Sequence, residues 1–323
     1  MTYVNDERAR ATRWKHSTDT LPAEAKVPAA YRRGDGVTGK PLYDFCLPAQ
    51  YAELSLLPEV RASALKLFAE LSIHWHFGVG TGPSNHLLSS QVQCVNALAQ
   101  MVTEPDRLKR AFGSLLGITD VLPIERHQYL TFEYIGPTDY FGEAPGRVRT
   151  RGANCTSVDA AFLIRTASGL RELILLEWKY TESYSARKAN AQSDAVRKGR
   201  YYGHWSAESG ALFSKLVGFD DILQEPFYQL VRQQLLAQEL ERHNVCDADR
   251  VRVLHVSPRA NTAYQRSIRR PGLLAMGGTV SEAWTGLLRT PDRFVSVDSD
   301  LFLDPDITSP EYAARCGSTT VGS

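Results

Sequence analysis

Cysteine is scarce in this chain, and its spacing excludes two kinds of small scaffold. The 323 residues include only Cys46, Cys94, Cys155, Cys246 and Cys316. The number is odd and no two of them form a CxxC pair, so neither a disulfide framework nor a zinc ribbon is expected. Reduced thiols in a cytoplasmic protein are the simplest interpretation.

Long apolar runs are also missing. The longest strictly apolar stretches, such as residues 160–164, are far shorter than the roughly 20 residues that a membrane-spanning helix needs. Residues 1–10 are polar and charged, without the apolar segment of a secretory signal. We therefore predict a cytoplasmic protein with no membrane partner.

An excess of one charge is missing from the chain as a whole. Lys and Arg total 37, Asp and Glu total 36, and 43% of the residues are hydrophobic, so disorder is excluded and a full core is expected. The charges are unevenly distributed, however. Residues 145–204 contain 11 basic and 5 acidic residues, whereas residues 292–323 contain 2 basic and 6 acidic ones. The basic segment makes nucleic acid a plausible partner despite the near-neutral total.

The N-terminal part of the chain is predicted to be irregular first and helical later. Residues 1–50 combine Arg, Ala, Thr, Gly and Pro with weak periodicity, which predicts an irregular, basic leader. A helix is predicted from Pro58 to His76, because Pro58 suits the first turn of a helix. A second helix is predicted after Ser89, which can cap it, and a third over 105–116. The acidic tail from Asp298 is predicted to end loosely.

The middle of the chain contains strand-like segments. Three candidates cover residues 127–135, 156–166 and 173–180, and Ser168-Gly169 between the last two predicts a hairpin turn. Further helices are predicted over 186–204, 226–242 and 280–288, and further strands over 251–257 and 294–297. The order from Ser89 is helix, three strands, helix, strand, which predicts an α/β or α+β core.

This hairpin brings two acidic residues together. Asp159 lies nine residues before Ser168 and Glu177 lies eight residues after Gly169, so nearly equal arms place the carboxylates side by side. Glu177 and Lys179 lie two apart at the end of an apolar run and therefore point to the same face of the strand. Because a buried charge is costly unless it is paired or binds a metal, a hard divalent cation is expected here.

The motifs SVD at 157–159 and EWK at 177–179 resemble the signature of the PD-(D/E)XK nuclease superfamily. The segments SSQVQCVNAL (89–98), SVDAAF and PFYQLVRQQLLA (226–237) are similar to a branch of restriction endonuclease-like proteins. The resemblance covers about residues 84–258 and departs from the pattern at Val158, where the superfamily usually has Pro. It implies a restriction-endonuclease-like α/β core, a mixed central sheet flanked by helices, with an N-terminal helical extension.

The resemblance also implies a metal-dependent endonuclease that hydrolyses phosphodiester bonds in DNA, with a restriction or defence role. Asp159, Glu177 and the main-chain oxygen of Trp178 would hold Mg²⁺, for which Mn²⁺ could substitute. Lys179 would orient the attacking water and stabilise negative charge on the phosphoryl group.

Other residues are weaker candidates for the same function. In parts of the superfamily an upstream acid and a downstream Gln complete the site, and Glu133 and Gln229 fit those places. The alternative for Glu133 is an exposed strand residue, and the alternative for Gln229 is a solvated or capping helix residue. The segment RKGRYYGHW (197–205) could contact nucleic acid through Lys198, Arg200 and Tyr201. A solvated basic helix with an aromatic core contact is the alternative interpretation there.

We predict three segments: an N-terminal extension over 1–84, partly helical, a nuclease-like catalytic domain over 85–305, and a flexible acidic tail over 306–323. Two other functions stay open. One is a nucleic-acid-binding protein with the same fold and no activity. The other is a different hydrolase, in which Asp159 and Glu177 would lie far apart. RNA is not excluded as a substrate, and a homodimer would suit double-strand cutting although no residue indicates one.

Overall fold

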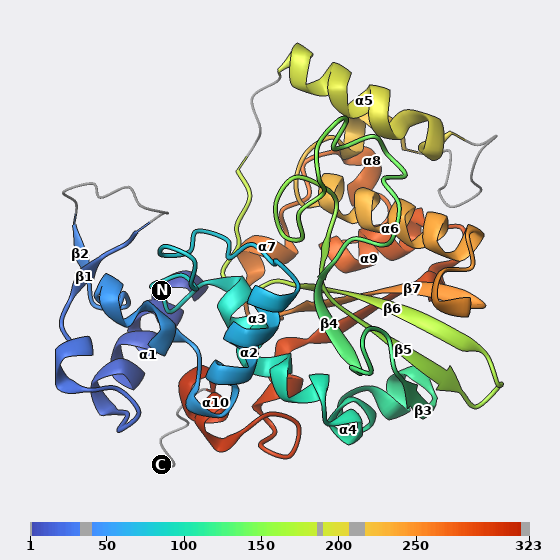
Figure 1. Ribbon diagram of the computed structural model, residues 1–323. Coiled ribbons are helices and arrows are strands. Elements are labelled where there is room, and N and C mark those ends of the chain that lie inside the picture. Colours follow the sequence, from blue (N-terminus) through green and yellow to red (C-terminus); the bar gives the residue numbers. More distant parts are fainter. Residues whose placement is uncertain (1, 33–40, 186–189, 207–216, 318–323) are drawn as a thin grey trace.

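The computed structural model describes residues 2–32, 41–185, 190–206 and 217–317 (Figure 1). Its helices are α1 (Tyr3–Ser17), α2 (Pro58–Glu70), α3 (Ser90–Leu98), α4 (Pro105–Leu116), α5 (Ala191–Trp205), α6 (Phe227–Arg242), α7 (Thr262–Gln265), α8 (Pro271–Leu274), α9 (Val280–Leu287) and α10 (Pro310–Cys316). Its strands are β1 (Ala29–Ala30), β2 (Leu42–Tyr43), β3 (Ile118–Leu122), β4 (Leu130–Tyr134), β5 (Val158–Thr166), β6 (Arg171–Trp178), β7 (Arg250–Ser257) and β8 (Phe294–Asp298). None of the helices in these ranges has the length and apolar character needed to span a bilayer.

A mixed sheet of six strands forms the centre of the protein. Its order is β3, β5, β6, β7, β8, and β4 also pairs with β5. Strand β5 is antiparallel to β3, β4 and β6, whereas β6, β7 and β8 are parallel. The prediction of a mixed central sheet flanked by helices is confirmed, and α3, β4, β5, β6, α6 and β7 follow the predicted order. Strand β3 was not predicted.

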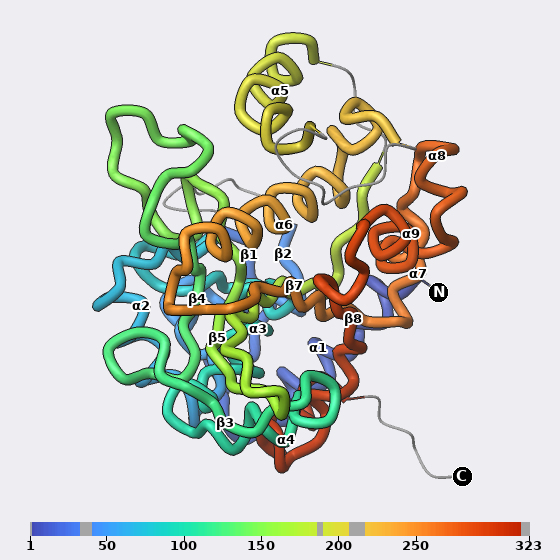
Figure 2. Tube along the Cα trace, turned by 90° about the vertical axis from the view of Figure 1, so that its right-hand side faces the viewer, coloured from blue at the N-terminus to red at the C-terminus, as the bar shows by residue number. Residues whose placement is uncertain are grey.

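Helices cover both faces of this sheet. Alternate residues of β5 and β6 point to opposite faces, so Phe162 and Ile174 pack in one apolar cluster with α2, α3 and α4, while Leu163 and Leu175 pack in another with α6 and α9. Figure 2 shows α5 stacked outside α6 on the second face. Because both faces are buried, β5 and β6 are apolar along most of their length.

Both ends of the chain are folded where the sequence predicted irregular structure. Helix α1 buries Trp14 and packs against α10, in which Tyr312 is buried. The apolar periodicity of α1 is weak because its buried face also includes the charged residues Glu7 and Lys15. The predictions of an irregular leader and of a flexible tail are therefore wrong for residues 3–17 and 310–316, and residues 318–323 lie outside the described residues.

Local signals placed most other elements correctly. Ser89 caps α3, because its hydroxyl accepts a hydrogen bond from the Val92 amide at 3.4 Å. Gly169 has a φ of +85° in the β5–β6 turn, a conformation that suits glycine. The predicted helix from Pro58 ends at Glu70 rather than His76. The helix predicted over 186–204 is present as α5, and residues 186–189 lie outside the described residues.

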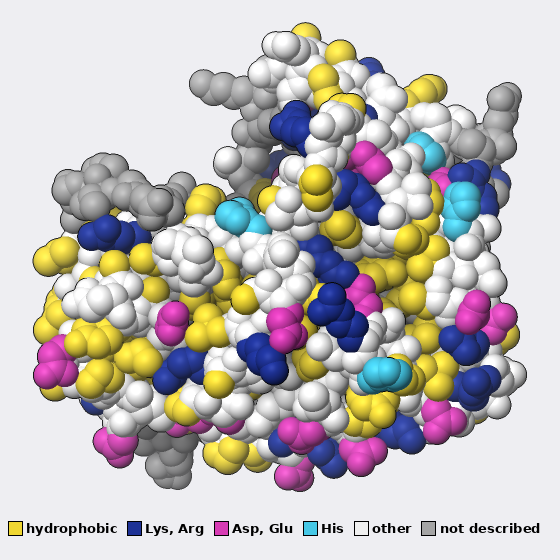
Figure 3. All heavy atoms as spheres, viewed as in Figure 1, with side chains coloured by type: hydrophobic (Ala, Val, Ile, Leu, Met, Phe, Trp, Pro, Cys, Tyr) yellow, Lys and Arg dark blue, Asp and Glu magenta, His cyan; other side chains and the backbone are white. Residues whose placement is uncertain are grey.

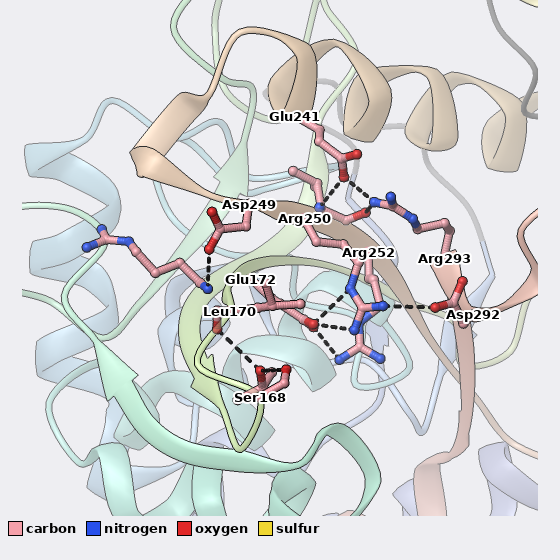
Figure 4. A network of polar contacts seen from close by, with 12 residues as sticks. Ser168, Leu170, Glu172, Glu241, Asp249, Arg250, Arg252, Asp292 and Arg293 are labelled. Carbon is pink, nitrogen blue, oxygen red and sulfur yellow. Dashed lines mark hydrogen bonds and ion pairs between the residues drawn. The ribbon is translucent and has the colours of Figure 1, made fainter.

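A buried ion network closes the hairpin end of the sheet (Figure 4). Glu172 is fully buried and is the register partner of Arg250 on β7. Arg250 donates to Glu172 Oε1 at 2.8 Å, and Arg252 Nη2 lies 2.5 Å from Glu172 Oε2. Arg250 also donates to the exposed Asp292 at 2.8 Å. The single buried carboxylate of Glu172 thus compensates two arginines, of which Arg252 is buried and Arg250 is half-buried.

Substituting Glu172→Gln should destabilise the fold strongly, since it leaves two arginines without their buried counter-charge. Breaking a buried ion pair from one side costs about 3–5 kcal/mol. Asp292→Asn is the matched control, because it removes an exposed partner of the same Arg250 and should cost less than about 1 kcal/mol. Urea unfolding measures both changes. Equal loss of stability in the two variants would contradict the assigned role of Glu172.

Candidate active site

The strand register places Asp159 opposite Glu177. Ala160 pairs with Leu176 in the antiparallel β5–β6 ladder, so the next step of the same register pairs the two acids. The amide of Trp178 donates to Asp159 Oδ2 at 2.7 Å, which holds the ends of the two strands together. The structure therefore brings together Asp159 and Glu177, which the nearly equal arms of the predicted hairpin placed side by side.

Glu177 and Lys179 lie at the centre of a buried polar cluster. Glu177 is 2% exposed and Lys179 is 5% exposed, and the two form an ion pair. Gln229 bridges them, because its side chain accepts from Lys179 Nζ at 2.7 Å and donates to Glu177 Oε1 at 2.6 Å. Gln233, one helical turn further along α6, donates to Glu177 Oε2. The predicted residues Glu177, Lys179 and Gln229 thus meet in one cluster.

Gln233 was missed by the sequence analysis, although a signal for it exists. Residues four apart on a helix lie on the same face, so any helix that presents Gln229 to the sheet also presents Gln233. A fully buried glutamine on an otherwise apolar face needs a partner. The carboxylate of Glu177 provides it, and both of its oxygens accept hydrogen bonds from protein donors.

The electrostatics of the cluster follow from burial and from the proximity of like charges. Burial, together with the charges of Glu177 and Glu133, raises the pKa of Asp159 well above its usual range. Burial disfavours the ammonium of Lys179, but the contact with Glu177 outweighs it and raises the pKa of Lys179. Lys179 therefore stays charged across the physiological range, and it faces more than one carboxylate.

Glu133 extends this row of acids by one strand. In the β4–β5 ladder Phe132 pairs with Ala160 and Tyr134 with Val158, so Glu133 lies opposite Asp159. Its φ of +47° is unusual for a residue with a side chain. The carboxylate accepts hydrogen bonds from Gln91 at 2.7 Å and from Ser157 at 2.9 Å.

Burial raises the pKa of Glu133 to about 7, against the opposing effect of its two hydrogen bonds. Glu133 is only 7% exposed, so the alternative interpretation of an exposed strand residue is wrong. Gln91 on α3 was not predicted. It also donates to the main-chain oxygen of His74 at 3.1 Å, and so ties Glu133 to the loop that follows α2.

The row ends on β7 at His255, which is the register partner of Glu177. His255 is fully buried, and its Nε2 lies 2.7 Å from the hydroxyl of Tyr264. Burial, together with the positive charge of Lys179, lowers the pKa of His255 to about 3. The imidazole is therefore neutral and adds no charge to the cluster.

The donor atoms at this end of the sheet fit a hard divalent cation. Asp159 is only partly buried, and its Oδ1 accepts no hydrogen bond from any residue in the described ranges. Those ranges contain no group of three or more His, Cys, Asp or Glu side chains arranged to hold a metal ion. A cation would thus need main-chain, water or substrate oxygens in addition, which is how Mg²⁺ is usually bound.

Helix α5 presents only part of its predicted nucleic-acid-binding set. Lys198 is exposed and pairs with Asp220 at 2.6 Å, and Arg200 is half-buried. Tyr201 is 1% exposed, and its hydroxyl donates to Glu143. The prediction that Tyr201 stacks on a base is wrong, because its ring faces the protein interior between Phe141 and Tyr228.

The raised pKa of Glu133 predicts a pH-dependent stability in the absence of divalent ions. The folded protein binds this proton more tightly than the unfolded chain, so the contribution is fully present below pH 4.5 and is lost as the pH rises through about 7. The rise from 4.5 to about 7 corresponds to about 3 kcal/mol. His255, whose pKa is lowered, contributes in the opposite sense over the same range. The fall is therefore read from a comparison of the wild type with Glu133→Gln, by urea unfolding in EDTA at pH 5 and pH 8.

Between pH 5 and pH 8 the wild type should lose more stability than Glu133→Gln, because the contributions of Asp159 and His255 are present in both proteins. Glu70→Gln is the control, because Glu70 is exposed on α2 and should leave the dependence unchanged. A Glu133→Gln variant with the same pH dependence as the wild type would refute the raised pKa.

Comparison with known proteins gives one family. A family model described as "Restriction Endonuclease associating with ARP" matches residues 8–309, which include the whole central sheet and the cluster around Glu177. No curated protein and no solved structure matches the chain significantly. The match covers most of the chain, and the protein therefore belongs to the family of restriction endonucleases associating with ARP.

Proposed function

We propose that this protein is a metal-dependent nuclease that hydrolyses phosphodiester bonds in DNA, built on a restriction-endonuclease-like core. The observation that carries the proposal is the meeting of Asp159, Glu177 and Lys179 at one end of the central sheet. Membership of a restriction endonuclease family supports DNA as the substrate. A different hydrolase with a chance motif is disfavoured, because it required the two acids to lie far apart.

Mg²⁺, or Mn²⁺ in its place, would be held by Asp159, Glu177 and the main-chain oxygen of Trp178. Such an ion supplies a water of lowered pKa and neutralises charge that develops on the phosphoryl group. Among the described residues none donates to Asp159 Oδ1, and this supports the assignment, since a carboxylate oxygen without a donor suits a cation. Substrate phosphate and water would complete the ligands.

Lys179 would orient the attacking water and stabilise negative charge on the phosphoryl group. Its ammonium is fixed between Glu177 and Gln229. A fixed cation in a region with little water stabilises developing charge more strongly than a mobile one in bulk solvent. Glu133, whose pKa lies near neutrality, would complete the acidic site and could hold or release a proton there.

The remaining expectations extend this proposal. Lys198 and Arg200 on α5 would contact phosphates of the substrate, and RNA would be the alternative substrate. A restriction or defence role follows from the family. Cytoplasmic location and a homodimer that cuts both strands stay predictions.

Cleavage of plasmid DNA with Mg²⁺ or Mn²⁺ tests the proposal. The wild type should cut, and Asp159→Asn and Lys179→Gln should each lower the rate by about 10²-fold or more, because each removes a charge on which the transition state depends. Lys66→Gln, at an exposed position on α2, is the matched control and should cut like the wild type. Unfolding curves for all variants separate lost chemistry from lost fold.

Two outcomes would refute the nuclease. If Asp159→Asn and Lys179→Gln cut as fast as the wild type, any observed cleavage arises elsewhere or from a contaminant. If the wild type binds DNA but does not cut it, whichever divalent metal is added, the protein is a nucleic-acid-binding member of the family without activity. The occupation of both Glu177 oxygens by protein donors is the observation that favours this second function.

A further inference from the structure

The loop that joins β4 to β5 rises directly from the proposed active site. It begins after Glu133 and Tyr134 and ends at Ser157, two residues before Asp159. Both of its ends therefore lie in the row of acids. The loop is not part of the catalytic cluster, and its outer residues were not among the predicted site residues.

The base of this loop is rigidly built. The guanidinium of Arg149 donates to the main-chain oxygens of Ile135, Gly136 and Thr138 at 2.9–3.0 Å. Asp139 accepts hydrogen bonds from the amides of Glu143 and Ala144, each at 2.9 Å. Glu143 in turn accepts from the amide and the hydroxyl of Thr156 at 2.7 Å, close to the start of β5.

The tip of the loop is a tight turn that presents two side chains to solvent. The amide of Arg147 donates to Ala144 at 3.0 Å across Pro145-Gly146, and Gly146 has a φ of +68°, as expected for glycine at the third position of a type II turn. Asn154 fixes the outgoing arm, because its amide donates to the Val148 oxygen at 3.0 Å. Arg147 and Val148 follow directly after this turn.

Val148 is 85% exposed, more than any other exposed large apolar side chain in the described ranges. Arg147 beside it is also exposed, and its side chain makes no hydrogen bond or ion pair with a described residue. The acids of the same loop are satisfied internally, Asp139 by amides and Glu143 by Thr156, Tyr201 and Arg232. Figure 3 shows basic and apolar side chains next to one another over this region.

We propose that Arg147 and Val148 form a wedge that engages duplex DNA beside the scissile phosphate. Val148 enters between base steps and partly unstacks them, while Arg147 contacts a neighbouring phosphate. This inference rests on the proposed function for its placement beside the reacting phosphate.

Physical reasons favour DNA over a protein partner for this tip. Specific protein interfaces bury about 800 Å² on each side, far more than one valine on a narrow turn can offer. Apolar side chains that are inserted between base steps and kink the duplex are a recognised mode of DNA binding. An arginine beside them with no partner among the described residues suits the phosphate backbone. A rigid loop is also needed, since a flexible one would bend before the bases separated.

The test uses a closed circular plasmid, because an inserted side chain unwinds DNA whatever its sequence. The protein is bound in EDTA, which prevents cutting, and the plasmid is relaxed with a topoisomerase that needs no metal. After removal of protein, the wild type should leave a shifted linking number. Val148→Ala should reduce that shift by more than half, with DNA affinity lowered less than about 10-fold, a change of about 1.4 kcal/mol.

Arg147→Gln tests the phosphate contact separately. It should weaken binding and reduce the slope of log affinity against log salt by about 1. Leu170→Ala is the matched control, because Leu170 is 37% exposed in the turn at the opposite end of β5 and β6. It should alter neither the linking number nor the salt slope. All three substitutions are at exposed positions, so the fold should be retained.

Wild-type binding without a change in linking number would overturn the wedge, and so would equal behaviour of Val148→Ala and Leu170→Ala. Failure of the nuclease proposal looks different. In that case Val148 and Arg147 would still govern binding in EDTA while no metal supported cleavage. Conversely, cleavage that depends on Asp159 but not on Val148 would refute the wedge and leave the nuclease proposal intact. No binding to DNA, with a protein captured through Val148 instead, would also overturn the wedge.

Discussion

The pairing register of β5 and β6 is the constraint on which the rest of the proposed site depends. A slip by one residue would turn Asp159 to the opposite face from Glu177. The apolar pattern alone resists such a slip weakly, because both faces of these strands are buried. Polar contacts at the two ends fix the register instead. At one end Thr166 donates to Leu170 across the turn, and at the other the Trp178 amide donates to Asp159.

The two ends of the sheet compensate buried charge in opposite ways. At the hairpin end, one carboxylate faces two arginines, so the positive charge there is in excess and is shared with the exposed Asp292. At the other end, Lys179 pairs with Glu177 while Asp159 and Glu133 lie in the same row of acids, and the negative charge is in excess. The raised pKa values of Asp159 and Glu133 express that excess. A divalent cation and a phosphate would together suit this imbalance.

The sequence predicted the fold and the site best where local chemistry decides. The turn at Ser168-Gly169, the cap at Ser89 and the apolar runs of β5 and β6 act over a few residues, and from them the meeting of Asp159 and Glu177 followed. Tyr201 was misjudged, because its burial depends on the distant Phe141 and Tyr228. Helices α1 and α10 and the role of Gln233 were missed for the same reason, since they depend on tertiary partners.

One of those missed helices, α1, supports the proposed site from the far face of the strand, together with α3. In the run from Glu177 to Tyr180, alternate side chains point to opposite faces, and only Glu177 and Lys179 reach α6. Trp178 donates to Gln93 on α3 at 2.8 Å, and the hydroxyl of Tyr180 donates to the buried Glu7 on α1 at 2.6 Å. Holding the even-numbered side chains fixes the backbone that carries the odd-numbered ones. The N-terminal helix therefore belongs to the same structural unit as the acids. Without it, the hydroxyl of Tyr180 would lose Glu7, its only side-chain partner among the described residues.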